Sequence, residues 1–251
     1  MNPMAVDLSG RTALVTGGTR GIGFGIASAL AKAGARVVLN YLQDQDRAQR
    51  AVERLRASGA QVRAIRADVR SAREVRKLIS GARRQLGGPN ILVNNVGSFI
   101  QKPLQELAVS EWREMIRSNL DSVFLCCREV LPLMRRDKNG RIVNIALANA
   151  DRVHAYRETA AYSIAKTGVL ILTRSLAQEQ AAHGITVNAV SPGLVKSGST
   201  SGKDTAAEES RIPMGRIGAP DDVAGAVLFL VGDRADYITG ANITVSGGWG
   251  L

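Results

Sequence analysis

The stretch Thr16-Gly17-Gly18-Thr19-Arg20-Gly21-Ile22-Gly23 joins two segments of opposite character. Residues 11–16 are mostly apolar or β-branched, which predicts a strand, and residues 22–32 are rich in alanine, which predicts a helix. Glycines in such a turn let the backbone approach a pyrophosphate, and the free N–H groups of the following helix face the anion. The stretch therefore predicts a dinucleotide-binding turn.

The same alternation continues along the chain. Further strands are predicted at residues 36–41, 62–66, 91–94, 141–145, 186–191 and 243–245, and further helices at about 45–57, 72–86, 111–135 and 160–182. Seven short apolar strands separated by helices are typical of a parallel sheet covered on both faces. The sequence therefore predicts an α/β fold, with residues 1–251 forming one doubly wound Rossmann-type domain.

One segment departs from this alternation. Residues 197–205 are rich in serine and glycine and precede an acidic stretch of helical character. Such a segment forms either a surface loop or a lid over a site, and both interpretations stay open for the region at about 194–215.

Composition narrows the classes of function. The net charge is +11, but the 33 basic residues are interleaved with acids and aromatic residues make up only 4% of the chain. We therefore expect anionic cofactors or substrates rather than nucleic acid.

The sequence also bears on the compartment. No signal peptide is evident, and neither a metal site nor an apolar run long enough for a membrane span is evident. The adjacent Cys126 and Cys127 are expected to be reduced core thiols. A cytoplasmic protein is predicted.

The end of the second predicted strand bears on the choice of cofactor. It reads Leu39-Asn40-Tyr41-Leu42, with no acid before Asp44. An acid in this place would accept hydrogen bonds from the ribose of NAD and repel a 2′-phosphate. Arg20, beside the glycine turn, offers a guanidinium for such a phosphate. NADP(H) is therefore favoured over NAD(H).

A second motif carries the chemistry. Tyr162 and Lys166 are four residues apart in a predicted helix, so their side chains lie on the same face. A nearby cation can lower the pKa of a tyrosine, which would make Tyr162 a general acid and base.

Taken together, these motifs resemble the short-chain dehydrogenase/reductase family over residues 8–251. The resemblance rests on the glycine turn and on Asp68-Val69, Asn94-Asn95-Val96-Gly97, Asn119, Tyr162 with Lys166, Pro192-Gly193, Tyr237-Ile238-Thr239-Gly240 and Gly247-Gly248. In detail the chain is similar to the 3-oxoacyl-[acyl carrier protein] reductases. The resemblance implies hydride transfer between a nicotinamide and a carbonyl or secondary alcohol.

The resemblance also implies roles for individual residues. Tyr162 would protonate the carbonyl oxygen, Lys166 would hold the nicotinamide ribose and lower the pKa of Tyr162, and Asn119 would bind a water in the proton relay. Asp68 would bind the adenine amine, and Val96 stands where alanine is usual. The motifs and the resemblance together give as cofactor-binding residues Gly17, Thr19, Arg20, Gly21, Ile22, Gly23, Asn40, Tyr41, Asp68, Val69, Asn95, Val96, Gly97, Tyr162, Lys166, Pro192, Gly193 and Val195.

The chain departs from the family at the serine that usually holds the substrate oxygen. Ala146 and Leu147 occupy its place, and the segment leading to Tyr162 is longer than usual. Losing a donor to a developing oxyanion costs about 10²–10³ in rate. The residues of the longer segment that could compensate are Asn149, Asp151, His154, Tyr156 and Thr159. Asn149 is the hypothesis adopted, with Asp151 kept open because some pteridine reductases similar to this family use an aspartate here.

Three functions remain under consideration. The first is an NADP(H)-dependent reductase of 3-oxoacyl thioesters, the second a reductase of a pterin or a secondary-metabolite ketone, and the third a dinucleotide-binding scaffold subunit with impaired catalysis. The resemblance further implies a homotetramer and, through Lys138 and His183, possible docking of the acidic acyl carrier protein. The apolar residues 248–251 could reach a neighbouring subunit.

Overall fold

A parallel sheet forms the centre of the computed structural model, which describes residues 6–196 and 205–250. Within these residues, seven strands lie in the order β3-β2-β1-β4-β5-β6-β7, and every neighbouring pair is parallel. The strands are β1 (Thr12–Val15), β2 (Arg36–Tyr41), β3 (Val62–Arg66), β4 (Ile91–Asn94), β5 (Gly140–Ile145), β6 (Ile185–Pro192) and β7 (Asn242–Val245). The chain reverses its winding between β1 and β4, and ligands bind at the carboxyl edge at such a point.

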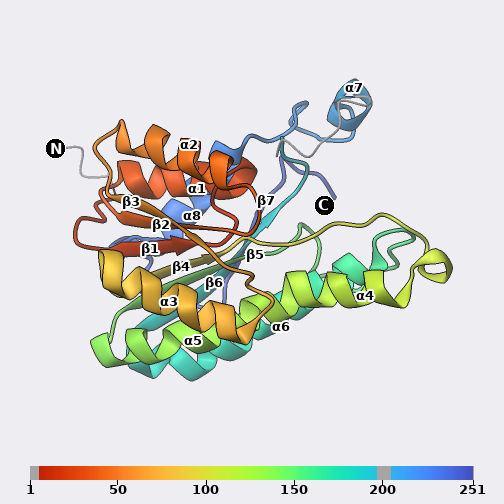
Figure 1. The fold of residues 1–251 in the computed structure, drawn as a ribbon. Coiled ribbons are helices and arrows are strands. Elements are labelled where there is room, and N and C mark those ends of the chain that lie inside the picture. The colour runs from red at the N-terminus through yellow and green to blue at the C-terminus, as the bar shows by residue number, and fades with distance from the viewer. Residues whose placement is uncertain (1–5, 197–204, 251) are drawn as a thin grey trace.

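Helices cover both faces of the sheet (Figure 1). One face carries α1 (Gly21–Lys32), α2 (Gln45–Arg56) and α8 (Pro220–Val231). The other carries α3 (Ala72–Leu86), α5 (Ser122–Asp137) and α6 (Ala160–Gln180), with α4 (Val109–Ile116) extending beyond the sheet. Short helical turns occupy Leu104–Glu106, Ala181–His183 and Asp233–Ala235. The predicted doubly wound α/β fold is confirmed.

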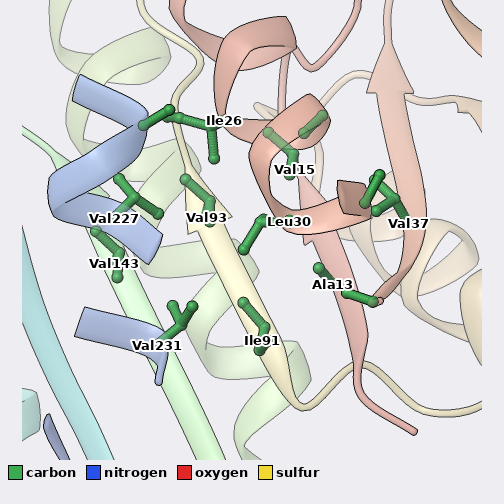
Figure 2. Packing of buried hydrophobic residues seen from close by; sticks show 14 of the residues in the cluster. Ala13, Val15, Ile26, Leu30, Val37, Ile91, Val93, Val143, Val227 and Val231 are labelled. Carbon is green, nitrogen blue, oxygen red and sulfur yellow. The ribbon is translucent and has the colours of Figure 1, made fainter. Parts of the chain in front are cut away.

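The strands are apolar on both sides because each side faces a separate core. Ala13 and Val15 of β1 pack in the core under α1 and α8, whereas Leu14 packs in the core under α3 and α5. Figure 2 shows Leu30 of α1 and Val227 of α8 directed toward the sheet. This double burial explains why the strand sequences do not alternate between apolar and polar residues.

Two helical regions differ from the sequence-based expectation. The single helix predicted over residues 111–135 is divided by a π-helical turn, Arg117–Asp121, between α4 and α5. Ser118 Oγ donates to the Glu114 carbonyl at 2.7 Å and Ser122 Oγ to the Ser118 carbonyl at 2.6 Å, and such side-chain bonds compete with regular helix bonding. A π turn of this kind often lies at a functional site.

Helix α8 was not predicted. Its signals are nevertheless present, because Pro220 begins the helix and Asp221 and Asp222 follow in the first turn. The start of α8 lies close to α1. A Cβ added at Gly25 of α1 would lie 2.7 Å from Pro220 Cβ. The glycine therefore allows the two helices to meet.

The region considered as a lid is described only in part, since residues 197–204 lie outside the described residues. The acidic stretch forms α7 (Thr205–Glu209), drawn well away from the body of the sheet in Figure 1. Whether residues 194–215 act as a lid stays a prediction. In the described part of the chain, no helix combines the length and the apolar character needed to cross a membrane. Cys126 and Cys127 are free and buried, as predicted.

Candidate active site

The glycine turn leads from β1 into an uncapped helix. Gly17 and Gly21 have φ angles of 60° and 51°, a region that favours glycine. Arg20 stands at the N-cap of α1 without a side-chain cap bond, so its side chain leaves the first N–H groups of the helix uncapped. A Cβ at Gly23 would overlap the Gly17 carbonyl oxygen and lie 2.6 Å from Asn95 Nδ2. The turn thus has the closed shape and exposed donors that fit a pyrophosphate.

Polar side chains hold this turn from the β4 side. Thr16 Oγ1 accepts hydrogen bonds from the backbone N–H groups of Asn95, at 2.9 Å, and Val96, at 3.2 Å. Asn95 Nδ2 donates to the Thr16 carbonyl at 3.0 Å. Val96 packs beside Gly17, where a Cβ would lie 3.2 Å from Val96 Cγ2. Asn95 and Val96 therefore shape the turn that is expected to hold the cofactor.

Asn40 holds the turn from the β2 side. Its side chain is 1% exposed, and Nδ2 donates to the Ala67 carbonyl at 2.9 Å. The Gly18 N–H donates to the Asn40 carbonyl at 3.1 Å. Asn40 therefore connects the glycine turn to β3, a structural role that the sequence did not reveal.

The first carboxylate after β2 already has hydrogen-bond partners. Asp44 caps α2 by accepting from the Arg47 N–H at 2.8 Å, and its carboxylate also pairs with the Arg47 guanidinium at 3.0 Å. Arg20 is exposed, and its guanidinium makes no hydrogen bond or ion pair within the described residues. Tyr41, the last residue of β2, is partly buried. This distribution of charge suits a ligand with an additional phosphate.

The loop after β3 contains a carboxylate with a strong partner. Arg70 donates to both oxygens of Asp68, at 2.9 and 2.8 Å, and this hydrogen bonding holds the pKa of Asp68 below its usual value. Val69 is buried in the core under α3. The sequence indicated Asp68 and Val69 but did not reveal Arg70.

Lys166 and Tyr162 lie together on α6. Lys166 is 3% exposed, its Nζ donates to the Ile145 carbonyl at 2.8 Å, and it lies 5.6 Å from the centroid of the Tyr162 ring. Burial lowers the pKa of Lys166 to about 8 and raises the pKa of Tyr162 to about 12. The expectation that Lys166 lowers the pKa of Tyr162 is therefore wrong for this structure, because loss of solvation dominates.

Asn119, in the π turn, approaches the same place. It is fully buried, and its Nδ2 donates to the carbonyls of Ser98, at 2.9 Å, and Met115, at 3.1 Å. Its Oδ1 has no hydrogen-bond partner within the described residues. A Cβ at Gly97 would overlap this oxygen and lie 3.5 Å from Lys166 Nζ. A buried acceptor without a partner is costly, so the arrangement fits a hydroxyl or water donor beside Lys166.

The place of the usual serine is apolar. Ala146 is buried, and Leu147 packs against the core under α3 and α5. Asn149, two residues further on, has a φ angle of 65°, and its amide contacts Gly250 so closely that a Cβ there would overlap it. The Asn149 amide makes no hydrogen bond in the part of the chain that the structure describes. Its donor hydrogens are therefore available.

The other candidates in this segment are arranged differently. Asp151 and His154 are exposed, and the His154 ring stacks against Tyr156 with centroids 4.0 Å apart. Tyr156 Oη donates to the Asn149 carbonyl at 3.1 Å. Thr159 Oγ1 lies 3.5 Å from Ser163 Oγ. None of the contacts described for these side chains involves Tyr162.

Phe99 is a neighbour of Tyr162 that sequence reasoning missed. The two rings meet edge to face with centroids 5.1 Å apart. Phe99 follows β4 in a loop with no regular pattern, so only its position two residues after Gly97 could have suggested it.

The turn after β6 lies against the C-terminal residues. The Gly193 N–H donates to the Val245 carbonyl at 3.0 Å, and a Cβ at Gly193 would lie 2.8 Å from Ser246 Cβ and 3.4 Å from Trp249 Cε3. Val195 is buried close by. Pro192 ends β6 at the carboxyl edge, the same edge as the glycine turn.

Lys138 and His183, in contrast, lie at the opposite edge. Lys138 precedes β5, His183 precedes β6, and a Cβ at Gly184 would lie 2.8 Å from the Lys138 carbonyl oxygen. The strands run in parallel from this edge toward the site. A partner docked on these two residues would therefore sit away from Tyr162 of the same chain.

Comparisons with known proteins agree with this geometry. A family model described as Enoyl-(Acyl carrier protein) reductase matches residues 17–250. The chain is 40% identical over 248 residues to the 3-oxoacyl-[acyl-carrier-protein] reductase FabG of Staphylococcus epidermidis, with 95% of this chain and 98% of the relative covered. It is 36% identical to 3beta-hydroxysteroid dehydrogenase 1 of Eggerthella lenta, with 98% and 95% covered.

A solved structure is also similar. The blue fluorescent protein from a metagenomic library in complex with NADPH has a TM-score of 0.91 and 34% identity, covering 98% of this chain and 100% of that chain. Fold and comparisons together define an α/β oxidoreductase with a glycine-rich turn at the carboxyl edge of its sheet. The protein belongs to the short-chain dehydrogenase/reductase family.

Proposed function

We propose that this oxidoreductase is an NADP(H)-dependent reductase of 3-oxoacyl thioesters. The observation that carries the proposal is the convergence of Lys166 and Asn119 around Gly97, with Tyr162 on the same helix as Lys166. The identity to a 3-oxoacyl-[acyl-carrier-protein] reductase supports the substrate class. Arg20 and the absence of a free acid at the end of β2 support the 2′-phosphate, as does a similar structure in complex with NADPH.

The residues of the site divide the work. NADPH, when bound, supplies the hydride. Tyr162, with its pKa raised to about 12, is fully protonated at neutral pH and donates its proton to the carbonyl oxygen. Lys166, with a pKa of about 8, is mostly a cation at pH 7 and holds the ribose hydroxyls. Asn119 Oδ1 accepts from the water or hydroxyl that resupplies the proton.

The partner of the substrate oxygen is assigned to Asn149. Leu147 offers no donor in the place of the usual serine. The Asn149 amide lies in the same loop, makes no hydrogen bond among the described residues and has its nitrogen against Gly250. Asn149 takes over the second hydrogen bond to the carbonyl oxygen in this proposal.

A second candidate function is the reduction of an apolar ketone. The identity to a hydroxysteroid dehydrogenase favours it, and so do the apolar ring of Phe99 against Tyr162 and the apolar Leu147 in the place of the usual serine. A pterin or a secondary-metabolite ketone belongs to the same alternative. A scaffold subunit with impaired catalysis would keep the fold and the turn but lose turnover.

The assembly is proposed to be a homotetramer. Phe124 of α5 is 47% exposed and Ile171 of α6 is 62% exposed, so these helices carry apolar surface that a second subunit would cover. Acyl carrier protein is proposed to dock at Lys138 and His183. Because these residues lie far from Tyr162 along the strands, such docking would serve the site of a neighbouring subunit.

The test is oxidation of NADPH at 340 nm with an acetoacetyl thioester, comparing the protein with Tyr162→Phe. We expect turnover in the wild type and a loss of about 10²–10⁴ in kcat for the variant, the range for general acid catalysis. NADPH binding, measured by fluorescence, should be retained in both. A wild type that binds NADPH but reduces neither the thioester nor a panel of steroid and pterin ketones would contradict the proposal.

A further inference from the structure

Arg70 lies between two carboxylates on different elements. One edge of its guanidinium donates to Asp68, at 2.9 Å from Nε and 2.8 Å from Nη2. The terminal Nη1 donates to both oxygens of Glu114, at 2.9 and 2.8 Å. Asp68 belongs to the loop after β3 and Glu114 to α4, so one side chain joins segments that are 46 positions apart by their numbering. The planar guanidinium suits this double contact, which the point charge of a lysine would not reproduce.

Glu114 continues the connection toward the reacting groups. Its Oε1 accepts from Ser98 Oγ at 2.9 Å, and its carbonyl accepts from Ser118 Oγ at 2.7 Å. The Ser98 carbonyl in turn accepts from Asn119 Nδ2 at 2.9 Å. Glu114 therefore fixes the loop after β4 through its carboxylate and contacts the π turn through its backbone carbonyl.

The other carboxylate partner of Arg70, Asp68, lies in the loop after β3, which is expected to receive the adenine of the cofactor. The Asp68 N–H donates to Glu74 Oε2 at 2.7 Å, and the Arg70 N–H donates to Asp68 Oδ1 at 2.9 Å, so the loop after β3 is closed on itself. The side chains of Asp68, Arg70 and Glu114 are 24%, 28% and 33% exposed. Partial burial and bidentate geometry distinguish them from ordinary surface ion pairs, which contribute little.

We propose that Arg70 is a positioning residue that couples the adenine end of the cofactor site to Asn119. The inference rests on the proposed function, since it assumes that Asp68 meets the adenine and that Asn119 serves the proton relay. Through Asp68 the guanidinium sets the loop that receives the cofactor. Through Glu114 and Ser98 it sets the oxygen that accepts from the relay.

The two contacts of Arg70, with Asp68 and with Glu114, predict separable effects on NADPH binding and on kcat. The contact with Asp68 is called one arm of Arg70 and the contact with Glu114 the other. Glu114→Gln removes the charge from one arm, and we expect kcat to fall about 10-fold with the KM and Kd for NADPH within twofold of wild type. Arg70→Met removes both arms, and we expect kcat to fall and the Kd for NADPH to rise, each about 10-fold or more. Arg70→Lys should restore at most one of the two parameters. Kinetics at 340 nm and fluorescence titration of NADPH measure them.

Arg76→Met is the matched control. Arg76 lies on α3, its side chain is 67% exposed, and its pair with Glu129 spans 3.6 Å. Both kinetic parameters should stay at wild-type values in this variant. Arg70→Met behaving like Arg76→Met would overturn the proposal, and so would Glu114→Gln with unchanged kcat. If Arg70→Met does not fold, the isosteric Glu114→Gln decides. A wild type that binds NADPH without turnover counts against the proposed function. In that case the Kd for NADPH still tests the role of Arg70, because an unchanged Kd in Arg70→Met would refute the coupling between the adenine end of the site and Asn119.

Discussion

The cofactor side and the substrate side of the site are built differently. Around the glycine turn, the side chains of Thr16, Asn40 and Asn95 are all engaged in hydrogen bonds to backbone groups. Around the loop after β5, residues 151–155 are exposed and the Asn149 amide is without a hydrogen bond in the described chain. The glycine turn is therefore held in one conformation by hydrogen bonds. The loop after β5 keeps side-chain donors that a ligand could use. A common cofactor can thus be combined with a divergent substrate.

Asn149→Ala tests the substrate side most directly. If the Asn149 amide donates to the reacting oxygen, kcat should fall about 10²–10³, or roughly 2.7–4 kcal/mol of transition-state stabilisation. The Kd for NADPH should not change, because the amide lies outside the glycine turn. Steady-state kinetics of this variant beside Asp151→Ala, whose side chain is exposed, provide the comparison. Unchanged turnover would remove Asn149 from the mechanism.

Gly23→Ala tests the close packing of the glycine turn on the cofactor side. The added methyl would overlap the Gly17 carbonyl oxygen and crowd Asn95 Nδ2, which lies 2.6 Å from the Cβ position. We expect a loss of about 3 kcal/mol in the free energy of unfolding and much weaker NADPH binding, since overpacking forces the backbone to shift. Urea denaturation and fluorescence titration measure both.

Gly225→Ala is the control for this change. A Cβ at Gly225, within α8, would meet no atom within 4 Å. This variant should be neutral or more stable by about 0.5–1 kcal/mol, because alanine loses less backbone entropy in a helix. If Gly23→Ala is as stable as Gly225→Ala, the packing of the turn is looser than described.

Lys166→Met tests the buried charge where the two sides meet. Between pH 8 and 10.5 the unfolded chain binds a proton on Lys166 that the folded chain has released, because burial lowers its pKa from 10.5 to about 8. The stability of the wild type relative to the variant should therefore be constant below pH 8 and rise by about 2 kcal/mol from pH 8 to 9.5. Urea denaturation across this range is the measurement, and a flat difference would contradict the lowered pKa.

Tyr156→Phe has the smallest expected effect and tests whether the loop after β5 must be held in place for catalysis. The variant loses the hydrogen bond from Tyr156 Oη to the Asn149 carbonyl, at 3.1 Å, while the stacked ring remains. We expect a loss of about 0.5–1.5 kcal/mol in the free energy of unfolding and a modest fall in kcat. His154→Ala, which removes only the stacking partner, separates the two contributions. A kcat unaffected by both changes would mean that this loop does not need fixing for catalysis.

The fold and the cofactor turn could be predicted because their signals are local. The strand at 91–94 and the turn from Thr16 to Gly23 are short patterns whose meaning depends on their immediate neighbours. The π turn could not be foreseen, since it depends on the hydroxyls of Ser118 and Ser122 bonding backward within a segment of ordinary helical periodicity. Helix α8 has recognisable start signals in the sequence, Pro220 and the two acids that follow it.

The substrate side depends on contacts between distant segments. Gly250 limits where the Asn149 amide can lie, and Phe99 covers the edge of Tyr162, yet neither neighbour is close in sequence. The pKa of Tyr162 was misjudged for the same reason. The spacing to Lys166 was visible, but the degree of burial that dominates the pKa follows only from the assembled fold.

The glycines that follow β7 constrain the loop after β5. Gly247, Gly248 and Gly250 all have positive φ angles and lie against Ile212, Pro213 and the Asn149 amide, respectively. A Cβ at Gly250 would overlap the Asn149 amide, so a side chain at this position would force the loop after β5 to move. The segment after β7 therefore limits the shapes that this loop can adopt, although about 100 residues separate the two along the chain.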